Sequence, residues 1–409
     1  MNYRLIKIIL VILSIVVISS ASIFSNKFYI LAYNIVLLPI LFNRGFLKVK
    51  FYLPIIWLLV NILVIYSFSL NVEYLRFSTS IITLFLFPYF ILAICRESYW
   101  VLFEKTVFYL SVVSLIIFPL NILFPGFFDY LFTFFRGITD DKFYMFFGQE
   151  TYWTSLIYVH MDDTYYGLFR NAGFMWEPGA FAWMIILALS IRILRNGIKF
   201  DKFLVVYTIA LLTTLSTSGY IAILVLFSGA IASKQKFSYL FTLILLLIIV
   251  VPYLYEVDFV GGEINAYVES YEEDFTDFTS SGFGAAKLDR FLFAKYQLIE
   301  VLKYPFGFGI YKPSDIDSMW NFVGVNGLSD LLFMWGVVGF ILIIYSLWRF
   351  FKVVSNKRHS NMLYLALFIG NLMMIFSNPA ATNPIVYFMI FTPLMEFFQK
   401  RNNINIGYK

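Results

Sequence analysis

The sequence predicts an all-α polytopic membrane protein, with about twelve transmembrane helices and a large extracytoplasmic loop that contains an amphipathic helix. Three observations indicate this class. The chain of 409 residues is 61% hydrophobic and only 13% charged, whereas soluble domains carry about 25% charged residues. Its apolar residues form runs long enough to cross a bilayer, which takes about 20 residues. Basic residues cluster between alternate runs, as is typical of cytoplasmic loops.

The interval 202–233 is the one place where the number of crossings is open, since it could form one long helix or two short ones. Basic residues precede this interval and also follow it. If both flanks stay cytoplasmic, the chain must cross outward and return, so we predict two short spans. The predicted spans are 4–22, 28–43, 51–71, 78–95, 102–124, 174–195, 202–217, 219–233, 237–254, 328–351, 360–377 and 383–399.

This topology places both termini in the cytoplasm, with 20 of the 30 basic residues but only four of the 25 acidic residues inside. The two long connections, 125–173 and 255–327, then lie outside. Connections above about 12–15 residues are usually functional or disordered. Both of these mix aromatic, glycine and charged residues, so we expect ordered loops and an extracytoplasmic working face. The predicted divisions are therefore spans one to five (1–124), the first loop, spans six to nine (174–254), the second loop, and spans ten to twelve with the C-terminus (328–409).

The segment RNAGFMWEPG at 170–179 sets charged residues at the mouth of span six. Pro178 favours the first position of a helix, so we predict that the helix begins there and that the residues from Arg170 to Gly173 are loop. A helix N-terminus suits phosphate, and Arg170 offers a bidentate fork for phosphate oxygens. The alternative is that Glu177 only complements the helix dipole and that Arg170 extends to the membrane interface.

Two further segments carry candidate residues. An apolar rhythm over 288–302 predicts an amphipathic helix at the membrane surface, with Lys287 and Arg290 near its start. A solvated charged face is the alternative for its lysines. The break STSG at 216–219 offers Ser216 and Ser218 either to a polar cavity or to a simple external turn.

The opening of span ten carries Asn326 and Asp330, which would share one face of a helix because they are four residues apart. Asp330 is close to the hydrocarbon edge, where an ionisable side chain is a candidate functional group. The alternative is that Ser329 or Asp330 only caps the helix.

Signals for cofactors are weak. Asp315 and Asp317 have the spacing of a metal-binding DxD pattern, which is common by chance in an acidic loop. His160 and His359 have no partner at metal-ligand spacing, and the sequence contains no phosphate-binding glycine loop or nucleophile elbow. We therefore expect no metal, no cofactor and no nucleic-acid partner.

The chain resembles the polysaccharide polymerases of the Wzy type, in the superfamily that also holds the O-antigen ligases. The resemblance covers most of the chain and depends on four local patterns in a fixed order. These are Arg170-x-x-Gly173-x-x-x-Glu177-Pro178, Ser216-Thr-Ser-Gly219, Arg290 followed by Pro305-x-Gly307-x-Gly309, and Asn326 followed by Gly336-Val-Val-Gly339.

This resemblance implies a glycosyltransferase of the bacterial inner membrane that acts outside the cytoplasm. It would transfer a growing O-antigen or capsular glycan from undecaprenyl diphosphate to the non-reducing end of another lipid-linked repeat unit. Arg170 and Arg290 would grip the diphosphate leaving group, and Glu177 or Asp330 would accept the proton of the acceptor hydroxyl. Gly173, Ser216, Ser218, Lys287, Asn326, Tyr165 and Tyr166 would bind substrate, the tyrosines by stacking on sugar rings. The expected partners are lipid-linked donor and acceptor, membrane lipids and a chain-length regulator.

Three rival functions stay open. A lipid-linked oligosaccharide flippase also has about a dozen spans, but it fits the long loop 255–327 poorly. An O-antigen ligase of this superfamily carries a histidine just ahead of the helix that opens here at Asn326, and this chain has none. A cell-wall polymerase with a similar membrane body is the third rival.

Overall fold

The computed structural model describes ten helices and four short strands. The residues it describes are 3–20, 27–43, 85–128, 130, 152–154, 157–161, 164–165, 168–233, 294, 297–299, 301–302, 305–307, 326–355, 359–379 and 381–400. The helices are α1 (Tyr3–Ser19), α2 (Lys27–Asn43), α5 (Phe87–Cys95), α6 (Ser98–Leu123), α8 (Pro178–Asn196), α9 (Lys202–Thr213), α10 (Thr217–Ala232), α15 (Gly327–Val354), α16 (Asn361–Phe376) and α17 (Pro384–Lys400).

The helices are those of a membrane protein. Among the described residues, α6, α8 and α15 are each long and apolar enough to cross a bilayer, and several shorter helices are equally apolar. Ten of the twelve predicted spans overlap a described helix, while 51–71, 78–84 and 237–254 lie outside the described residues. The interval 202–233 holds two helices, α9 and α10, so the prediction of two short elements rather than one long helix is confirmed.

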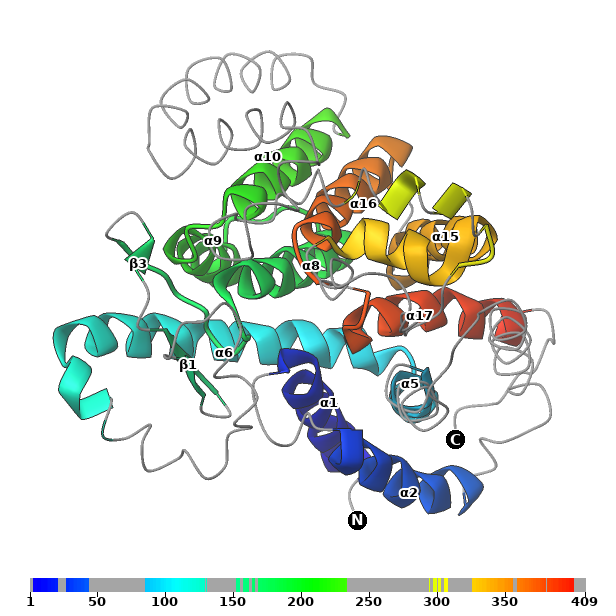
Figure 1. Cartoon of the computed structure of the whole chain (residues 1–409), viewed down its shortest axis with the longest axis horizontal. Helices are drawn as coiled ribbons and strands as arrows, with labels where there is room; N and C mark the ends of the chain where they lie inside the picture. Colours follow the sequence, from blue (N-terminus) through cyan, green and yellow to red (C-terminus); the bar gives the residue numbers. More distant parts are fainter. Residues whose placement is uncertain are drawn as a thin grey trace, which may run out of the picture.

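Helix α8 is the centre of the bundle (Figure 1). It packs against α6, α9, α10, α15 and α16, and 83% of its most apolar stretch is buried, compared with 28% for α6 and 44% for α15. Its sequence explains this position, because apolar residues surround the helix on all sides from Ala180 to Leu189. A helix that is hydrophobic all round belongs in a core. The middle of α8 is therefore apolar, and α8 can offer polar groups at the centre of the bundle mainly towards its two ends.

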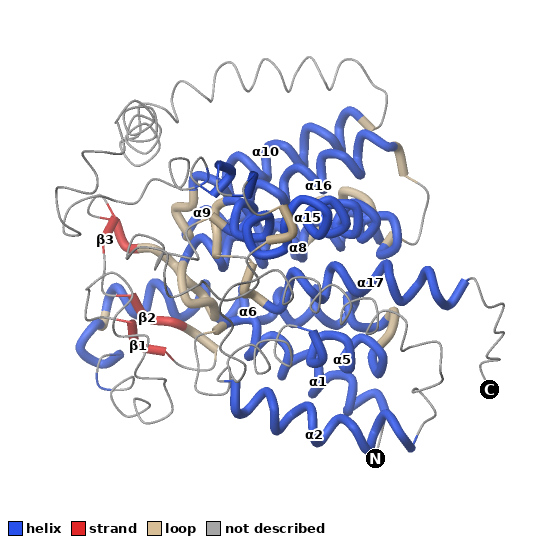
Figure 2. The backbone as a smooth tube through the Cα atoms, turned by 45° about the vertical axis from the view of Figure 1, so that its right-hand side comes forward, coloured by secondary structure: helices blue, strands red, loops and turns tan. Residues whose placement is uncertain are grey.

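Two β-hairpins lie beside the C-terminal half of α6 (Figures 1 and 2), within the first long loop. Strand β1 (Tyr152–Thr154) pairs antiparallel with β2 (Val159–Met161), and β3 (Thr164–Tyr165) pairs antiparallel with β4 (Leu168–Phe169). The sequence prediction of an all-α chain missed them. They are too short to change the class, and β4 leads the chain directly into Arg170.

Two hydrogen-bond contacts each join helix ends that the predicted topology puts on the same side. Asn383 Nδ2 donates to the carbonyl oxygen of Ile18 over 3.1 Å, and the prediction sets both residues at the outer face. At the other face, His359 Nε2 is 2.8 Å from the carbonyl oxygen of Leu194. Each contact joins two ends that the charge pattern assigns to one side of the membrane.

Helix α15 bends sharply at Gly336, whose φ of 63° and ψ of −177° are not helical. This residue conformation is accessible essentially to glycine alone. The segment from Pro305 to Gly307 packs into the bend, where the Val337 N–H donates to the Pro305 carbonyl over 2.9 Å. The third and fourth sequence patterns are therefore in contact, although they are about 30 residues apart.

Candidate functional site

The segment from Arg170 to Pro178 forms a compact loop that is folded around Asn171. The Asn171 Oδ1 atom accepts a hydrogen bond from the Gly173 N–H (2.9 Å), and its Nδ2 donates to the Thr213 hydroxyl (3.0 Å). The Asn171 N–H also donates to the Thr213 carbonyl over 2.9 Å. Asn171 is fully buried, so these bonds fix the loop firmly to the end of α9. Sequence analysis did not select Asn171, because an asparagine two residues before a glycine in a loop is typical of any turn.

Gly173 is required by the shape of this loop. Its φ is +56°, and a Cβ atom there would lie 2.7 Å from the ring of Phe181 in α8. The prediction that Gly173 is a site residue stays untested, but its structural reason is clear: only glycine lets the loop close onto the first turn of α8. The helix itself begins at Pro178, as predicted.

Arg170 is held against the break between α9 and α10. Its Nε–H donates to the Thr214 carbonyl over 3.1 Å, and the residue is half-buried. A bond at Nε fixes the plane of the guanidinium group, and the fork of a guanidinium suits phosphate oxygens. The structure thus brings together the first and second sequence patterns.

The break itself is a helix start built from serine. Ser216 caps α10, since its Oγ accepts from the Gly219 N–H (3.3 Å), and its hydroxyl is 3.2 Å from that of Ser218. A Cβ atom on Gly219 would lie 3.1 Å from the Cβ of Ala182, so this turn also packs closely on α8. The two serines therefore have a structural role at the capped turn beside Arg170.

An open apolar groove of about 320 Å³ adjoins Arg170. Its walls come from the outer part of α6, from β4, and from the break after α9; the lining residues are Phe118, Ile122, Leu168, Phe169, Thr213 and Leu215. Leu168 and Phe169 immediately precede Arg170 in the chain. Arg170 also binds the backbone of Thr214, which lies between the lining residues Thr213 and Leu215. An arginine next to an almost wholly apolar lining suits a ligand with an anionic head and a hydrocarbon tail.

Glu177 and Asn378 approach the first turn of α8 from two directions. Glu177 is the N-cap residue with extended backbone, but its side chain does not cap the helix. Its Oε1 atom lies 3.8 Å from the place that a Cβ atom of Gly179 would take, and Asn378 Oδ1 lies 3.2 Å from the same place. Asn378 belongs to the turn between α16 and α17 and is fully buried. It is a second residue that sequence analysis missed, because the pair Asn-Pro is read as a turn.

Asp330 makes a buried contact with Gln297. Gln297 Nε2 donates to Asp330 Oδ1 over 2.6 Å, and each residue is only 1% exposed. The cap of α15 is Asn326, whose Oδ1 accepts from the N–H groups of Leu328 (3.1 Å) and Ser329 (3.2 Å). The alternative in which Ser329 or Asp330 caps this helix is therefore wrong. Asp330 joins the segment around Gln297 to α15.

The remaining predicted residues are only partly placed. Tyr165 lies in β3 and pairs with Leu168. Tyr166, Lys287 and Arg290 lie outside the described residues, as does most of the predicted amphipathic helix. In the part of the chain that the structure describes, no group of three or more histidine, cysteine or acidic residues is arranged to hold a metal ion.

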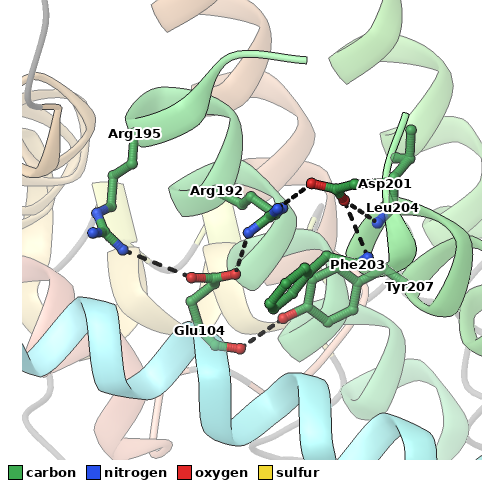
Figure 3. A network of polar contacts seen from close by, with 7 residues as sticks. All are labelled: Glu104, Arg192, Arg195, Asp201, Phe203, Leu204 and Tyr207. Atoms are coloured by element: carbon green, nitrogen blue, oxygen red, sulfur yellow. Dashed lines mark hydrogen bonds and ion pairs between the residues drawn. The ribbon is translucent and has the colours of Figure 1, made fainter. Parts of the chain in front are cut away.

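A charged network joins α6, α8 and α9 at the opposite end of the bundle (Figure 3). Glu104, which is 2% exposed, binds Arg192 over 3.2 Å and Arg195 over 3.7 Å. Arg192 also binds Asp201, which caps α9 through the N–H groups of its first turn. The Tyr207 hydroxyl donates to the Glu104 carbonyl over 2.7 Å. All groups are paired with one another, so the network is a structural tie between three helices.

Fold and site together define a helical membrane protein in which the loop before the central helix carries an arginine and a carboxylate. The two residues before that arginine line an apolar groove. In comparisons with protein-family models, curated proteins and solved structures, nothing matches this chain.

Proposed function

We propose that this protein is a glycosyltransferase that polymerises undecaprenyl-diphosphate-linked oligosaccharide repeat units into O-antigen or capsular polysaccharide. In this proposal the chain crosses the bacterial inner membrane twelve times, with both termini in the cytoplasm and the start of α8 at the outer face. Its partners are the lipid-linked donor and acceptor, the surrounding lipids and a chain-length regulator.

The observation that carries the proposal is the position of Arg170. Its Nε–H binds the Thr214 carbonyl, and Thr214 lies between two residues that line the apolar groove, Thr213 and Leu215. A prenyl diphosphate has the matching shape, with two phosphates at the end of a hydrocarbon chain. The phosphates would bind Arg170 and the first isoprene units would lie in the groove, while the rest of the chain stays in the bilayer.

The chemistry follows from charge. When the bond between sugar and diphosphate breaks, negative charge develops on the leaving phosphate oxygens. A fixed arginine stabilises that charge in the transition state. Arg290 and Lys287 would contribute further positive charge from the second loop, as the family resemblance implies. The donor arrives already activated, so no nucleotide or metal is needed.

We assign Glu177, rather than Asp330, as the base that accepts the proton of the acceptor hydroxyl. Glu177 is half-buried at the start of α8, in the loop that also carries Arg170. The Asp330 carboxylate is fully buried and binds Gln297, which suits a role in joining two segments.

The test is to reconstitute purified protein in liposomes with lipid-linked repeat units and no other enzyme. Polymerisation gives a ladder of glycan lengths on a gel. If no ladder forms and the repeat units instead appear on the opposite leaflet, the protein is a flippase and the proposal is wrong.

A further inference from the structure

We propose that Asn378 is an acceptor-positioning residue, whose Oδ1 atom binds a hydroxyl of the acceptor sugar beside Glu177 at the start of α8. This inference rests on the proposed function, because it names the subsite that the acceptor would use. It concerns a residue in the turn between α16 and α17, which belongs to none of the four sequence patterns.

The orientation of the Asn378 amide is fixed by its other end. Its Nδ2 donates to the Met374 carbonyl over 2.7 Å, and a carbonyl oxygen can only accept, so the NH₂ group must face Met374. The Oδ1 atom is then turned toward Gly179, the second residue of α8. It is buried and accepts no hydrogen bond from any described residue. Buried polar atoms of this kind are rare in folded proteins.

The space in front of Oδ1 exists because residue 179 is glycine. A Cβ atom there would be 3.2 Å from Asn378 Oδ1, which is tighter than an ordinary contact, and 3.8 Å from Glu177 Oε1. Two acceptor oxygens from distant parts of the chain therefore face one place at the first turn of α8. Pro178 has no N–H, and the Phe181 N–H binds the Glu177 carbonyl over 3.1 Å. The donors of this first turn that have no partner within the helix are therefore the N–H groups of Gly179 and Ala180.

This combination selects a hydroxyl group among the possible ligands. A phosphate would meet two acceptor oxygens and gain little. An ammonium group would meet the positive end of the helix dipole and could not accept from the helix N–H groups. A sugar hydroxyl both donates, to Asn378 or Glu177, and accepts from the helix. Held in this way, the hydroxyl lies beside the Glu177 carboxylate, which we propose accepts its proton.

The experiment measures binding of two probes to the purified full chain. The first is the oligosaccharide released by mild acid from the lipid-linked repeat unit, and the second is undecaprenyl diphosphate. Oligosaccharide binding is measured with undecaprenyl diphosphate at saturation, so that the donor site is occupied and the acceptor site is reported. The variants are Asn378→Leu, which removes the oxygen together with the Nδ2 bond to Met374, and Gly179→Ala, which fills the space in front of the oxygen and keeps that bond. Gly126→Ala is the matched control, since a Cβ atom there meets nothing within 4 Å.

We expect Asn378→Leu and Gly179→Ala each to weaken oligosaccharide binding about tenfold, the effect of losing one hydrogen bond of the stronger kind. Undecaprenyl diphosphate binding should match that of the Gly126→Ala control. Oligosaccharide binding at the control level in both variants would overturn the inference. An equal loss of binding of both probes would also overturn it, because it would mark a purely structural role. If the wild-type chain forms no ladder and binds no oligosaccharide, the proposed function itself fails.

Discussion

The backbones of Gly307 and Gly336 pack directly against each other, so closely that neither position has room for a side chain. A Cβ atom on Gly307 would be 2.5 Å from the Gly336 nitrogen, and one on Gly336 would be 2.3 Å from the Pro305 carbonyl oxygen. Both residues have positive φ, +85° and +63°. The end of the second loop is thereby set into the bend of α15, just beyond the contact between Gln297 and Asp330.

Replacing Gly336 by alanine should unfold this junction. The substitution forces a residue with a Cβ atom into a glycine conformation, at a cost of about 1–3 kcal/mol, and adds overlap with Pro305. Gly197 is a matched control, because its φ of 72° and ψ of 179° are nearly the same while a Cβ atom there meets nothing within 4 Å. In thermal unfolding, Gly197→Ala should lower the free energy of unfolding only by the conformational cost. Gly336→Ala should lower it by clearly more. Equal losses would mean that the close packing contributes nothing.

Much of this architecture could be predicted from the sequence, for physical reasons that are local. Pro178 marks the start of α8 because its ring suits the first helical position. The basic flanks of 202–233 indicated that the chain turns back, and two helices are found there. The bend at Gly336 was not predicted, since a glycine within an apolar run is common and only the approach of Pro305 explains it.

The site could be predicted only in part, because its members meet through tertiary contacts. Arg170 and Ser216 were both selected from the sequence, but nothing in the chain indicated that Arg170 would bind the backbone between them at Thr214. Asn171 and Asn378 were missed, because each is an asparagine in a turn, where local backbone chemistry is sufficient explanation. Their burial, which only the fold reveals, is what distinguishes them.

Asp330 should tolerate asparagine but not alanine. Asparagine keeps an Oδ1 atom that accepts from Gln297 Nε2, so polymer yield in Asp330→Asn should stay near that of the wild type. Asp330→Ala leaves a buried amide without its acceptor, which costs about 1–3 kcal/mol, and should reduce both stability and yield. The measurements are thermal unfolding and the glycan ladder. A stable Asp330→Asn protein without polymer would instead make Asp330 the catalytic base.

The charged network around Glu104 predicts unequal losses of stability when each of its two arginines is replaced. Arg192→Met removes the closer partner of the buried Glu104 carboxylate, and breaking a buried pair in this way costs about 3–5 kcal/mol. Arg195→Met removes a longer contact from a more exposed side chain, so it should cost about 1 kcal/mol or less. The double variant Glu104→Leu with Arg192→Met should recover much of the loss, because the fully buried carboxylate is gone. Thermal unfolding in detergent measures all three, and similar losses for both arginines would contradict this account.

Asp201 should make stability depend on pH at the acidic end. Partial burial by itself raises the pKa of Asp201, but hydrogen bonds from Arg192 and from the N–H groups of Leu204 and Phe203 outweigh it, so the pKa is lowered. A lowered folded-state pKa means that the carboxylate contributes its full stability above its unfolded pKa of about 3.9 and loses that contribution as pH falls through the folded value.

Asp201→Asn is the variant that isolates this charge, because asparagine is an equally good helix cap. The wild type should be more stable than Asp201→Asn at pH 7, and the difference should shrink as pH falls below about 4. Unfolding midpoints at a series of pH values measure it. A difference that stays constant over this range would show that the ionised carboxylate contributes nothing.

Arg170 should not be replaceable by lysine. Lysine has no Nε–H with which to bind the Thr214 carbonyl and no planar fork for phosphate, so its charge would be neither fixed nor bidentate. Losing a preorganised transition-state donor costs about 10²–10³ in rate, so Arg170→Lys and Arg170→Ala should abolish polymer while the protein stays in the membrane. Arg349→Lys is the control, since Arg349 lies in α15 near the end that the topology places inside. The glycan ladder and the amount of protein in the membrane fraction are measured together. Glycan chains of normal length in both Arg170 variants would show that Arg170 does not bind the diphosphate.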